Sequence, residues 1–107
     1  MNREEIKKVL PHREPFLFLD EVVSVNKEEV IAIKNVSIEE DYFRGHFPNY
    51  PVMPGVLILE TMAQSCGVLG SHIMGTEANK DSVYLFAGID KVRFKRKVLP
   101  GDVLTIK

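Results

Sequence analysis

Hydrophobic and polar residues follow two different patterns near the start of the chain. Asn2 and Glu5 have the spacing of a helix capping box, and the apolar residues between Glu5 and Pro11 recur at helical intervals. Residues 16–25 (FLFLDEVVSV) and 29–37 (EVIAIKNVS) are instead rich in Phe, Val and Ile, with a short polar stretch between them. The pattern predicts a short N-terminal helix, then two antiparallel strands joined by a hairpin.

A long apolar run begins at Pro54 and continues to Met74, where Gly75 provides a stop signal, and this predicts one long helix. At about 100° per residue, its apolar side chains form one stripe that we expect to face the core. The stripe comprises Leu59, Met62, Cys66, Leu69 and Ile73. A row on a different side, free to face a partner subunit, comprises Glu60, Gln64, Gly67 and Ser71.

Further strand patterns follow at 83–89 (VYLFAGI), at 91–98 (KVRFKRKV) and, after a Pro-Gly-Asp turn signal, at 103–107 (VLTIK). Inside the predicted helix, Gly67 and Gly70 each cost about 1 kcal/mol relative to alanine, so we expect another backbone to pack closely there. A strand-rich chain with one mostly buried helix predicts an α+β fold in which an antiparallel sheet curls around that helix.

Composition limits the function without identifying it. The 107 residues suffice for a single domain, near the size at which association with another subunit adds burial. The 14 basic and 15 acidic side chains are balanced, which argues against nucleic acid as a partner. The single cysteine has no partner for an internal disulfide, the N-terminus is too polar for a secretion signal, and polar residues interrupt the longest apolar run. We therefore expect a cytoplasmic homo-oligomer without membrane insertion.

The stretch GHFPNYPVMPG, which starts at Gly45, has three prolines at intervals of three. Proline fixes its own φ and pushes the preceding residue toward extended geometry, so the loop is stiff. A stiff loop suits a side chain that must be held close to a reacting atom, and His46 is the candidate base. Taken alone, a histidine is more often a structural residue, and the prolines also fit a polyproline ligand. His12 and His72 are expected to be structural or exposed.

The loop leads into the start of the long helix, where the amides of Gly55 and Val56 favour developing negative charge. Glu60 follows within two turns in apolar company, which favours the protonated carboxyl group and makes it a candidate acid. Together these groups suit removal of a proton α to a carbonyl with loss of a neighbouring oxygen. The alternative for Glu60 is a solvated helix residue. No histidine pair has metal-ligand spacing and Cys66 lies on the apolar stripe, so neither a metal site nor a cysteine nucleophile is expected.

Four basic residues of the 91–98 segment form what we call the basic patch: Arg93, Lys95, Arg96 and Lys97. They fit either the solvated face of a strand or a docking surface for an acidic partner. Because the overall charge is near neutral, nucleic acid is a poor candidate for that partner.

Three stretches resemble, in the same order, the (3R)-hydroxyacyl-[acyl carrier protein] dehydratases of bacterial type II fatty acid synthesis. They are LPHREPFLFLDEV at 10–22, FRGHFPNYPVMPGVLILETMAQ at 43–64 and FAGIDKVRFKRKVLPGD at 86–102. The resemblance implies a hot-dog fold, a long helix wrapped by an antiparallel sheet, in a homodimer or a trimer of dimers. It also implies acyl carrier protein as the partner, for which the basic patch is the candidate docking surface. No cofactor is expected, because the thioester carbonyl itself makes the α-proton acidic.

By the same resemblance, His46 matches the catalytic histidine and Glu60 the catalytic carboxylate. Glutamate at this position, where the related dehydratase/isomerase branch carries aspartate, implies dehydration without isomerisation. The Gly55 amide matches the group that binds the thioester carbonyl, and Gln64 matches a glutamine beside the site. The expected substrate-binding set is Gly55, Val56, Gln64 and Phe47.

The family continues with further strands after the one that starts at Val103. Residues 1–107 are therefore expected to form a single hot-dog domain that lacks the family's last strands, with strand edges left uncovered. Two other functions stay open at this point. One is acyl-thioester hydrolysis, which the same fold hosts, and the other is non-catalytic binding of an acyl thioester or its carrier protein.

Overall fold

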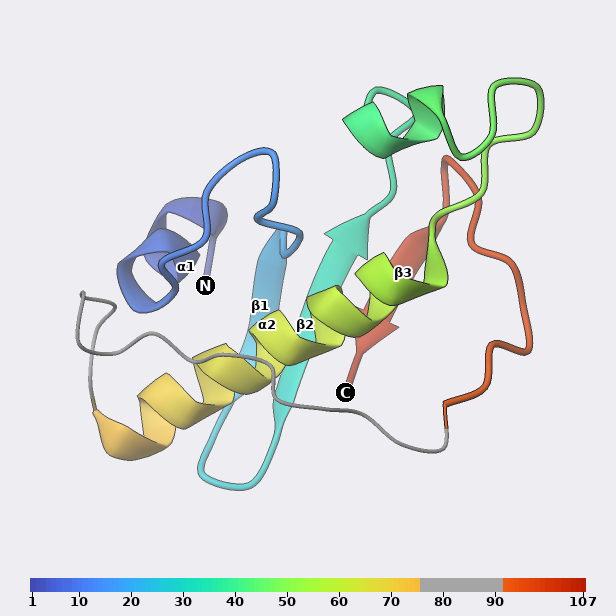
Figure 1. Ribbon diagram of the computed structural model, residues 1–107. Coiled ribbons are helices and arrows are strands. Elements are labelled where there is room, and N and C mark those ends of the chain that lie inside the picture. The colour runs from blue at the N-terminus through green and yellow to red at the C-terminus, as the bar shows by residue number, and fades with distance from the viewer. Residues whose placement is uncertain (76–91) are drawn as a thin grey trace.

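The computed structural model describes residues 1–75 and 92–107. The described elements, in chain order, are α1 (Arg3–Val9), β1 (Glu21–Val25), β2 (Val30–Asn35), the 3-10 helix η1 (Asp41–Arg44), α2 (Gly55–Met74) and β3 (Val103–Ile106). In Figure 1, α2 lies across the sheet made by the three strands, and α1 lies beside β1. A long helix with an antiparallel sheet agrees with the α+β prediction.

The sheet has the order β1-β2-β3, and both pairings are antiparallel. The predicted hairpin joins β1 to β2, and the Asn26 side chain closes its turn by accepting hydrogen bonds from the backbone amides of Glu28 and Glu29 at 2.8 and 3.0 Å. The strand predicted at 103–107 is confirmed as β3, which pairs with β2 on the side opposite β1. β2 is thus the central strand.

The capping box predicted for the N-terminal helix is confirmed. Asn2 Oδ1 accepts a hydrogen bond from the Glu5 N–H at 2.9 Å, and Glu5 Oε1 accepts one from the Asn2 N–H at 3.1 Å. The helix ends at Val9, before Pro11, as expected. Its buried residue Ile6 joins a core cluster that also contains Leu10, Leu17, Leu19, Val22, Val30, Ala32 and Val68.

The strand predicted at 16–25 is shorter in the structure, because β1 begins only at Glu21. In the preceding residues, Gln64 Oε1 accepts a hydrogen bond from the Phe18 N–H at 2.9 Å. The Arg3 guanidinium donates to two backbone carbonyls of the same segment, at 2.7 and 3.0 Å. Side chains thus bind the backbone groups that a sheet ladder would otherwise use.

The strand predicted at 91–98 is wrong for residues 92–98, which are described and form no strand. This segment lies along the loop before α2 instead, and the Met53 N–H donates to the Val98 carbonyl at 2.8 Å. Both edges of β2 are already paired, with β1 and with β3, so the segment has no place beside the central strand. The strand predicted at 83–89 lies outside the described residues.

The long helix runs from Gly55 to Met74, one residue later at its start than predicted because Pro54 is its N-cap, and Gly75 ends it with a left-handed φ of 68°. The expectation that its apolar stripe faces the core is wrong. Met62 and Ile73 are 47% and 54% exposed, and Cys66 is exposed too. The buried side chains of α2 are instead Thr61, Gln64, Ser65, Val68 and Ser71.

This mostly polar face packs against the sheet because its polar groups are satisfied. The hydroxyls of Thr61 and Ser65 donate to carbonyls one turn back, at 2.7 and 3.1 Å, so neither hydroxyl enters the core as an unpaired donor. Gln64 and Ser71, which were expected to be free to face a partner subunit, are buried within their own chain. With 20 residues and a mean hydropathy of 1.2, α2 is long and apolar enough to span a membrane. Core helices of soluble proteins meet the same criterion.

The two glycines of α2 differ in their surroundings. A Cβ built on Gly67 would lie 2.9 Å from Cδ2 of the buried Leu10, so the neighbour that packs closely there is a side chain and not the predicted backbone. A Cβ on Gly70 would meet no atom within 4 Å in the part of the chain that is described, so the prediction is wrong for that residue. Gly67 is thus where the C-cap residue of α1, Leu10, packs against α2.

Candidate active site

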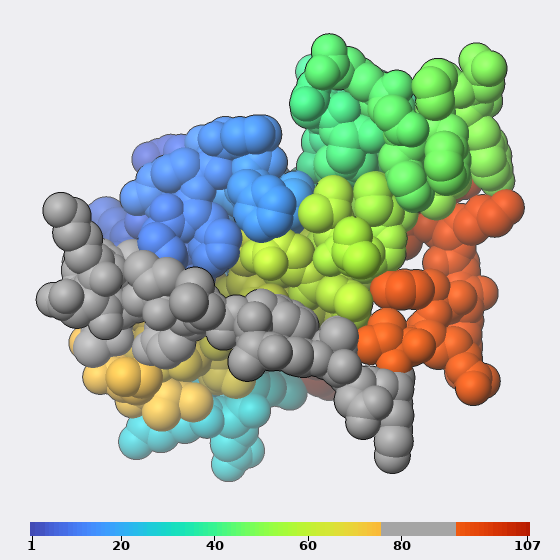
Figure 2. All heavy atoms as spheres, viewed as in Figure 1, coloured from blue at the N-terminus to red at the C-terminus, as the bar shows by residue number. Residues whose placement is uncertain are grey.

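The loop that carries His46 is anchored at both ends by buried side chains. Phe43, in η1, and Met53, before α2, pack with Val36 at the end of the hairpin, in a cluster separate from the main core. In Figure 2 the residues of this loop, in green, project from the body beside the start of α2 and the orange 92–100 segment. The two ends of the loop are therefore held in place by buried side chains, whereas its middle is exposed.

Backbone hydrogen bonds inside the loop fix the position of His46. The Phe47 and Tyr50 backbones exchange hydrogen bonds at 3.2 and 3.0 Å, and the Val52 N–H donates to the His46 carbonyl at 2.9 Å. The His46 N–H in turn donates to the Tyr42 carbonyl at 3.0 Å. These hydrogen bonds close the loop on itself, which agrees with the stiffness predicted from its prolines.

The imidazole of His46 has a defined tautomer. Its Nδ1 lies 2.7 Å from the Val52 carbonyl oxygen, which can only accept, so Nδ1 carries the hydrogen. Nε2 is then left with its lone pair free, as a base requires. The Phe47 ring stacks on the imidazole with ring centroids 4.2 Å apart and planes inclined by 24°, and it holds the ring orientation from one side.

The first turn of α2 presents amides that lack an acceptor. The Pro54 carbonyl accepts from the amides of Leu57 and Ile58, whereas the amides of Gly55 and Val56 make no hydrogen bond among the described residues. Free amides at a helix N-terminus favour an anion or a polarised carbonyl oxygen. The Phe94 ring lies against Gly55, since a Cβ built on that residue would be 2.7 Å from two ring carbons. Glycine therefore leaves room for the ring.

Glu60 lies in a second group of side chains, with Gln64 and His12. Its Oε2 accepts a hydrogen bond from Gln64 Nε2 at 2.9 Å and lies 3.5 Å from His12 Nε2. Gln64 also binds the backbone of Phe16 and Phe18, so its amide is fully occupied. Glu60 is thus held from two sides, by its own helix and by the loop after α1.

In the described part of one chain, the two predicted catalytic residues make no direct contact. No hydrogen bond or ion pair joins His46 to Glu60 in the described part of the chain, where His46 contacts Val52 and Phe47 while Glu60 contacts Gln64 and His12. No three His, Cys, Asp or Glu side chains of residues 1–75 and 92–107 are close enough together to hold a metal ion.

All four residues of the basic patch are exposed. Lys97 Nζ donates to the Tyr50 hydroxyl at 3.0 Å and lies 5.0 Å from the centre of the same ring. Because Tyr50 belongs to the loop that carries His46, the basic patch adjoins that loop. The sequence had not suggested this proximity, since the two residues are 47 positions apart.

Two groups of residues were missed by sequence reasoning. His12 was expected to be structural or exposed, yet it contacts Glu60, a long-range contact that no spacing along the chain signals. Lys34 is buried and forms an ion pair with Glu40, whose other oxygen accepts from the Tyr42 hydroxyl at 2.9 Å. Burial and the neighbouring Glu40 carboxylate raise the pKa of Tyr42, which keeps it a donor. The alternation in β2 was a usable signal for Lys34, because positions 30, 32 and 34 share a face.

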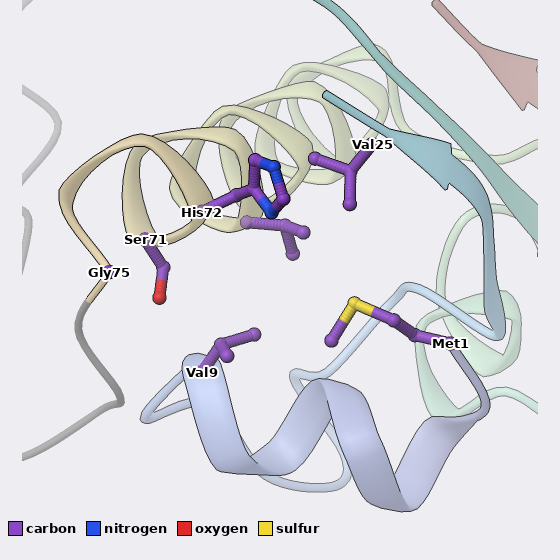
Figure 3. Close-up of a pocket in the computed structure, with 7 residues that line it drawn as sticks. Met1, Val9, Val25, Ser71, His72 and Gly75 are labelled. Atoms are coloured by element: carbon purple, nitrogen blue, oxygen red, sulfur yellow. The ribbon is translucent and has the colours of Figure 1, made fainter. Parts of the chain in front are cut away.

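A pocket of about 230 Å³ lies between α1, the end of β1 and the last turns of α2, apart from the residues around His46 and those around Glu60. Figure 3 shows Met1, Val9 and Val25 around it, with His72 on the α2 side. None of the predicted site residues lines this pocket, and its lining is largely apolar.

Known proteins with similar sequences share one family. A family model described as the FabA-like domain matches residues 10–107. The curated 3-hydroxyacyl-[acyl-carrier-protein] dehydratase FabZ of Saccharophagus degradans is 56% identical over 103 residues, 95% of this chain and 71% of that protein. The FabZ of Teredinibacter turnerae is 59% identical over 99 residues, 92% of this chain and 68% of that protein.

A solved structure agrees with the sequence comparisons. The dehydratase heterocomplex ApeI:P from Xenorhabdus doucetiae contains a chain that is 25% identical and matches with a TM-score of 0.71, over 94% of this chain and 66% of that one. The family match spans nearly all of the sequence, and the long helix with its antiparallel sheet fits it. The chain therefore belongs to the FabA-like domain family and has the hot-dog fold.

Proposed function

We propose that the protein removes water from a (3R)-3-hydroxyacyl group, carried as a thioester on acyl carrier protein, and yields the trans-2-enoyl thioester. The curated relatives are 3-hydroxyacyl-[acyl-carrier-protein] dehydratases by name. The observation that carries the proposal is the hydrogen bond from His46 Nδ1 to the Val52 carbonyl, which leaves Nε2 of a rigidly held imidazole as a base.

His46 starts the reaction by accepting the proton from C2 of the acyl group at Nε2. The thioester carbonyl makes this proton acidic, so the step needs no cofactor. The electron pair of the broken C–H bond moves toward the carbonyl oxygen, and the free amides of Gly55 and Val56 stabilise the charge that develops there. Phe47, stacked on His46, supports the base and borders the substrate.

Glu60 completes the elimination by donating its proton to the hydroxyl on C3. The C3–O bond breaks, a water molecule leaves, and the electron pair from C2 forms the double bond between C2 and C3. His46 then holds one extra proton and Glu60 lacks one, so a single proton transfer between them through water restores both groups. Gln64 keeps the Glu60 carboxyl group in place during this cycle.

The absence of a direct contact between His46 and Glu60 in the described part of one chain fits an active site shared by two subunits. A two-fold axis that brings His46 of one subunit to Glu60 of the other makes two equivalent sites in a homodimer. The exposed apolar residues of α2, Met62 and Ile73 among them, provide a surface for such a dimer. Dimers of this kind could assemble further into a trimer of dimers.

The basic patch is proposed to dock acyl carrier protein. Its position beside Tyr50 places it next to the loop of His46, so a carrier bound there would deliver its thioester to the base. A soluble carrier and a reducing environment for Cys66 fit a cytoplasmic enzyme. Neither a cofactor nor a metal ion has a part in the proposed reaction.

Product analysis tests the proposal. The purified protein is incubated with a (3R)-3-hydroxyacyl thioester of acyl carrier protein, and the enoyl thioester and the free thiol are both measured. We expect the absorbance band of the enoyl thioester and no release of thiol. Thiol release without that band would show a thioesterase, and carrier binding without any product would show a non-catalytic binding module.

A further inference from the structure

His12 lies against Glu60, although nothing in its sequence position indicates a role in the reaction. It belongs to the loop after α1, and its Nε2 is 3.5 Å from Glu60 Oε2. The two side chains are 27% and 22% exposed, so the contact is largely shielded from water. Shielding strengthens a contact between a donor and a carboxyl oxygen.

The loop holds His12 firmly in this position. The guanidinium of the next residue, Arg13, donates to the carbonyls of Leu10 and His12 at 2.9 and 2.6 Å and to the Lys7 carbonyl at 3.0 Å. These hydrogen bonds tie the backbone of His12 to the end of α1. The point from which its side chain extends toward α2 is therefore fixed by the fold.

Of the two ring nitrogens of His12, Nε2 is the one with a neighbour. Nδ1 is buried and has no hydrogen-bond partner in the described part of the chain. A neutral imidazole carries one hydrogen, and placing it on Nε2 provides a donor for Glu60 Oε2. Glu60 Oε2 then accepts a hydrogen bond from Gln64 Nε2 at 2.9 Å and has the His12 Nε2 hydrogen as a more distant neighbour, at a nitrogen–oxygen distance of 3.5 Å.

Two donors on one oxygen determine where the carboxyl proton sits. In a protonated carboxyl group, one oxygen acts as a carbonyl acceptor and the other carries the hydrogen. Donors on Oε2 make that oxygen the acceptor, so the hydrogen of Glu60 is on Oε1. Oε1 is then the atom that donates to the departing hydroxyl.

We infer that His12 is a positioning residue for the dehydration: together with Gln64 it fixes Glu60 Oε2, so that the proton on Oε1 points at the substrate. This inference rests on the proposed function, since it specifies how the acid of that reaction is oriented. Orientation of an acid within a fraction of an ångström affects turnover more than binding.

Variants of His12 that differ in donor position test the inference. His12→Gln keeps an N–H donor near the position of Nε2, His12→Asn has its amide one carbon shorter, and His12→Leu has no donor. We expect His12→Leu and His12→Asn to lower kcat roughly tenfold, the size of one lost hydrogen bond to a carboxyl group, with KM changed less than about twofold. His12→Gln should retain most of kcat. His72→Leu, an exposed histidine on α2, is the control and should leave both constants unchanged.

Wild-type kcat in His12→Leu, or equal losses in the Gln and Asn variants, would overturn the inference. If His12→Leu does not fold, the comparison of Gln with Asn still decides it. Absence of enoyl product from the wild type would instead overturn the proposed function. In that case a double-mutant cycle of His12→Leu with Glu60→Gln, read as free energy of unfolding, judges the contact separately, and additive losses would exclude it.

Discussion

Replacing Gln64 by leucine tests the contact that links the fold to the candidate active site. The Gln64 amide accepts from the Phe18 N–H at 2.9 Å and donates to the Phe16 carbonyl at 2.8 Å and to Glu60 Oε2 at 2.9 Å. The side chain is 1% exposed, so water cannot readily take over these bonds. Gln64→Leu therefore removes three hydrogen bonds and replaces the glutamine with a side chain of similar volume.

The expected loss follows from the burial of each bonded group. Phe18 is buried, and a buried N–H left without an acceptor costs about 1–3 kcal/mol. Phe16 is half exposed and the Glu60 side chain is 22% exposed, so the Phe16 carbonyl and the Glu60 carboxyl group can bind water, and each of these lost bonds costs about 0.5–1 kcal/mol. Added apolar contact from leucine offsets roughly 1 kcal/mol. We expect the free energy of unfolding to fall by about 2 kcal/mol, the balance of these contributions.

Urea unfolding followed by far-ultraviolet circular dichroism measures this change, and His72→Gln, at an exposed position of the same helix, is the control. His72→Gln should stay within about 0.5 kcal/mol of the wild type. A Gln64→Leu variant as stable as this control would show that the buried backbone of residues 16–18 does not depend on the Gln64 amide, and would refute the expected loss.

Three further predictions concern the packing of α2, the buried ion pair and the basic patch. Gly67→Ala should be less stable to urea than Gly70→Ala by about 1–3 kcal/mol, because only the former crowds a buried side chain; equal stabilities would contradict the close approach of α1 and α2. Glu40→Ala should lower the free energy of unfolding by about 3 kcal/mol, since it leaves the buried Lys34 charge unpaired, whereas the exposed Glu39→Ala should have no measurable effect; similar values for the two variants would refute this. Neutralising the basic patch should raise KM for the carrier-protein substrate but not for a small thioester, and added salt should reduce the difference because the Debye length is about 8 Å at physiological ionic strength; equal effects on both substrates would leave the patch without a docking role.

Local signals predicted the boundaries of the helices well. The capping box at Asn2 and the left-handed Gly75 each depend on a few adjacent residues, and both are found in the structure. The strand at 16–20 was wrong because the side chains that bind its backbone, those of Arg3 and Gln64, come from distant positions. Apolar spacing also misassigned the buried face of α2, since hydroxyls that bond back to the helix can pack in a core as apolar groups do.

The candidate site was predicted in its parts but not in its contacts. A proline-stiffened loop before a helix indicated His46 as a base, and the structure adds the tautomer through the Val52 carbonyl. The neighbours of Glu60 were only half predicted: Gln64 is one turn away on the same helix, whereas His12 reaches it from a loop 48 residues earlier in the sequence. Helical periodicity relates neighbours one turn apart, and it contains no information on contacts across the fold.

The shared active site is tested most directly by combining two inactive subunits. His46→Ala and Glu60→Gln should each lower kcat by about 10², the contribution of a base or an acid, without loss of folding. The two variants are unfolded together and reassembled; with random pairing about half of the dimers are mixed, and each mixed dimer has one site with both lesions and one with neither. An active site shared by two subunits predicts recovery of about a quarter of wild-type activity. A reassembled mixture that stays as inactive as its parents, with mixed dimers shown to be present, would contradict it.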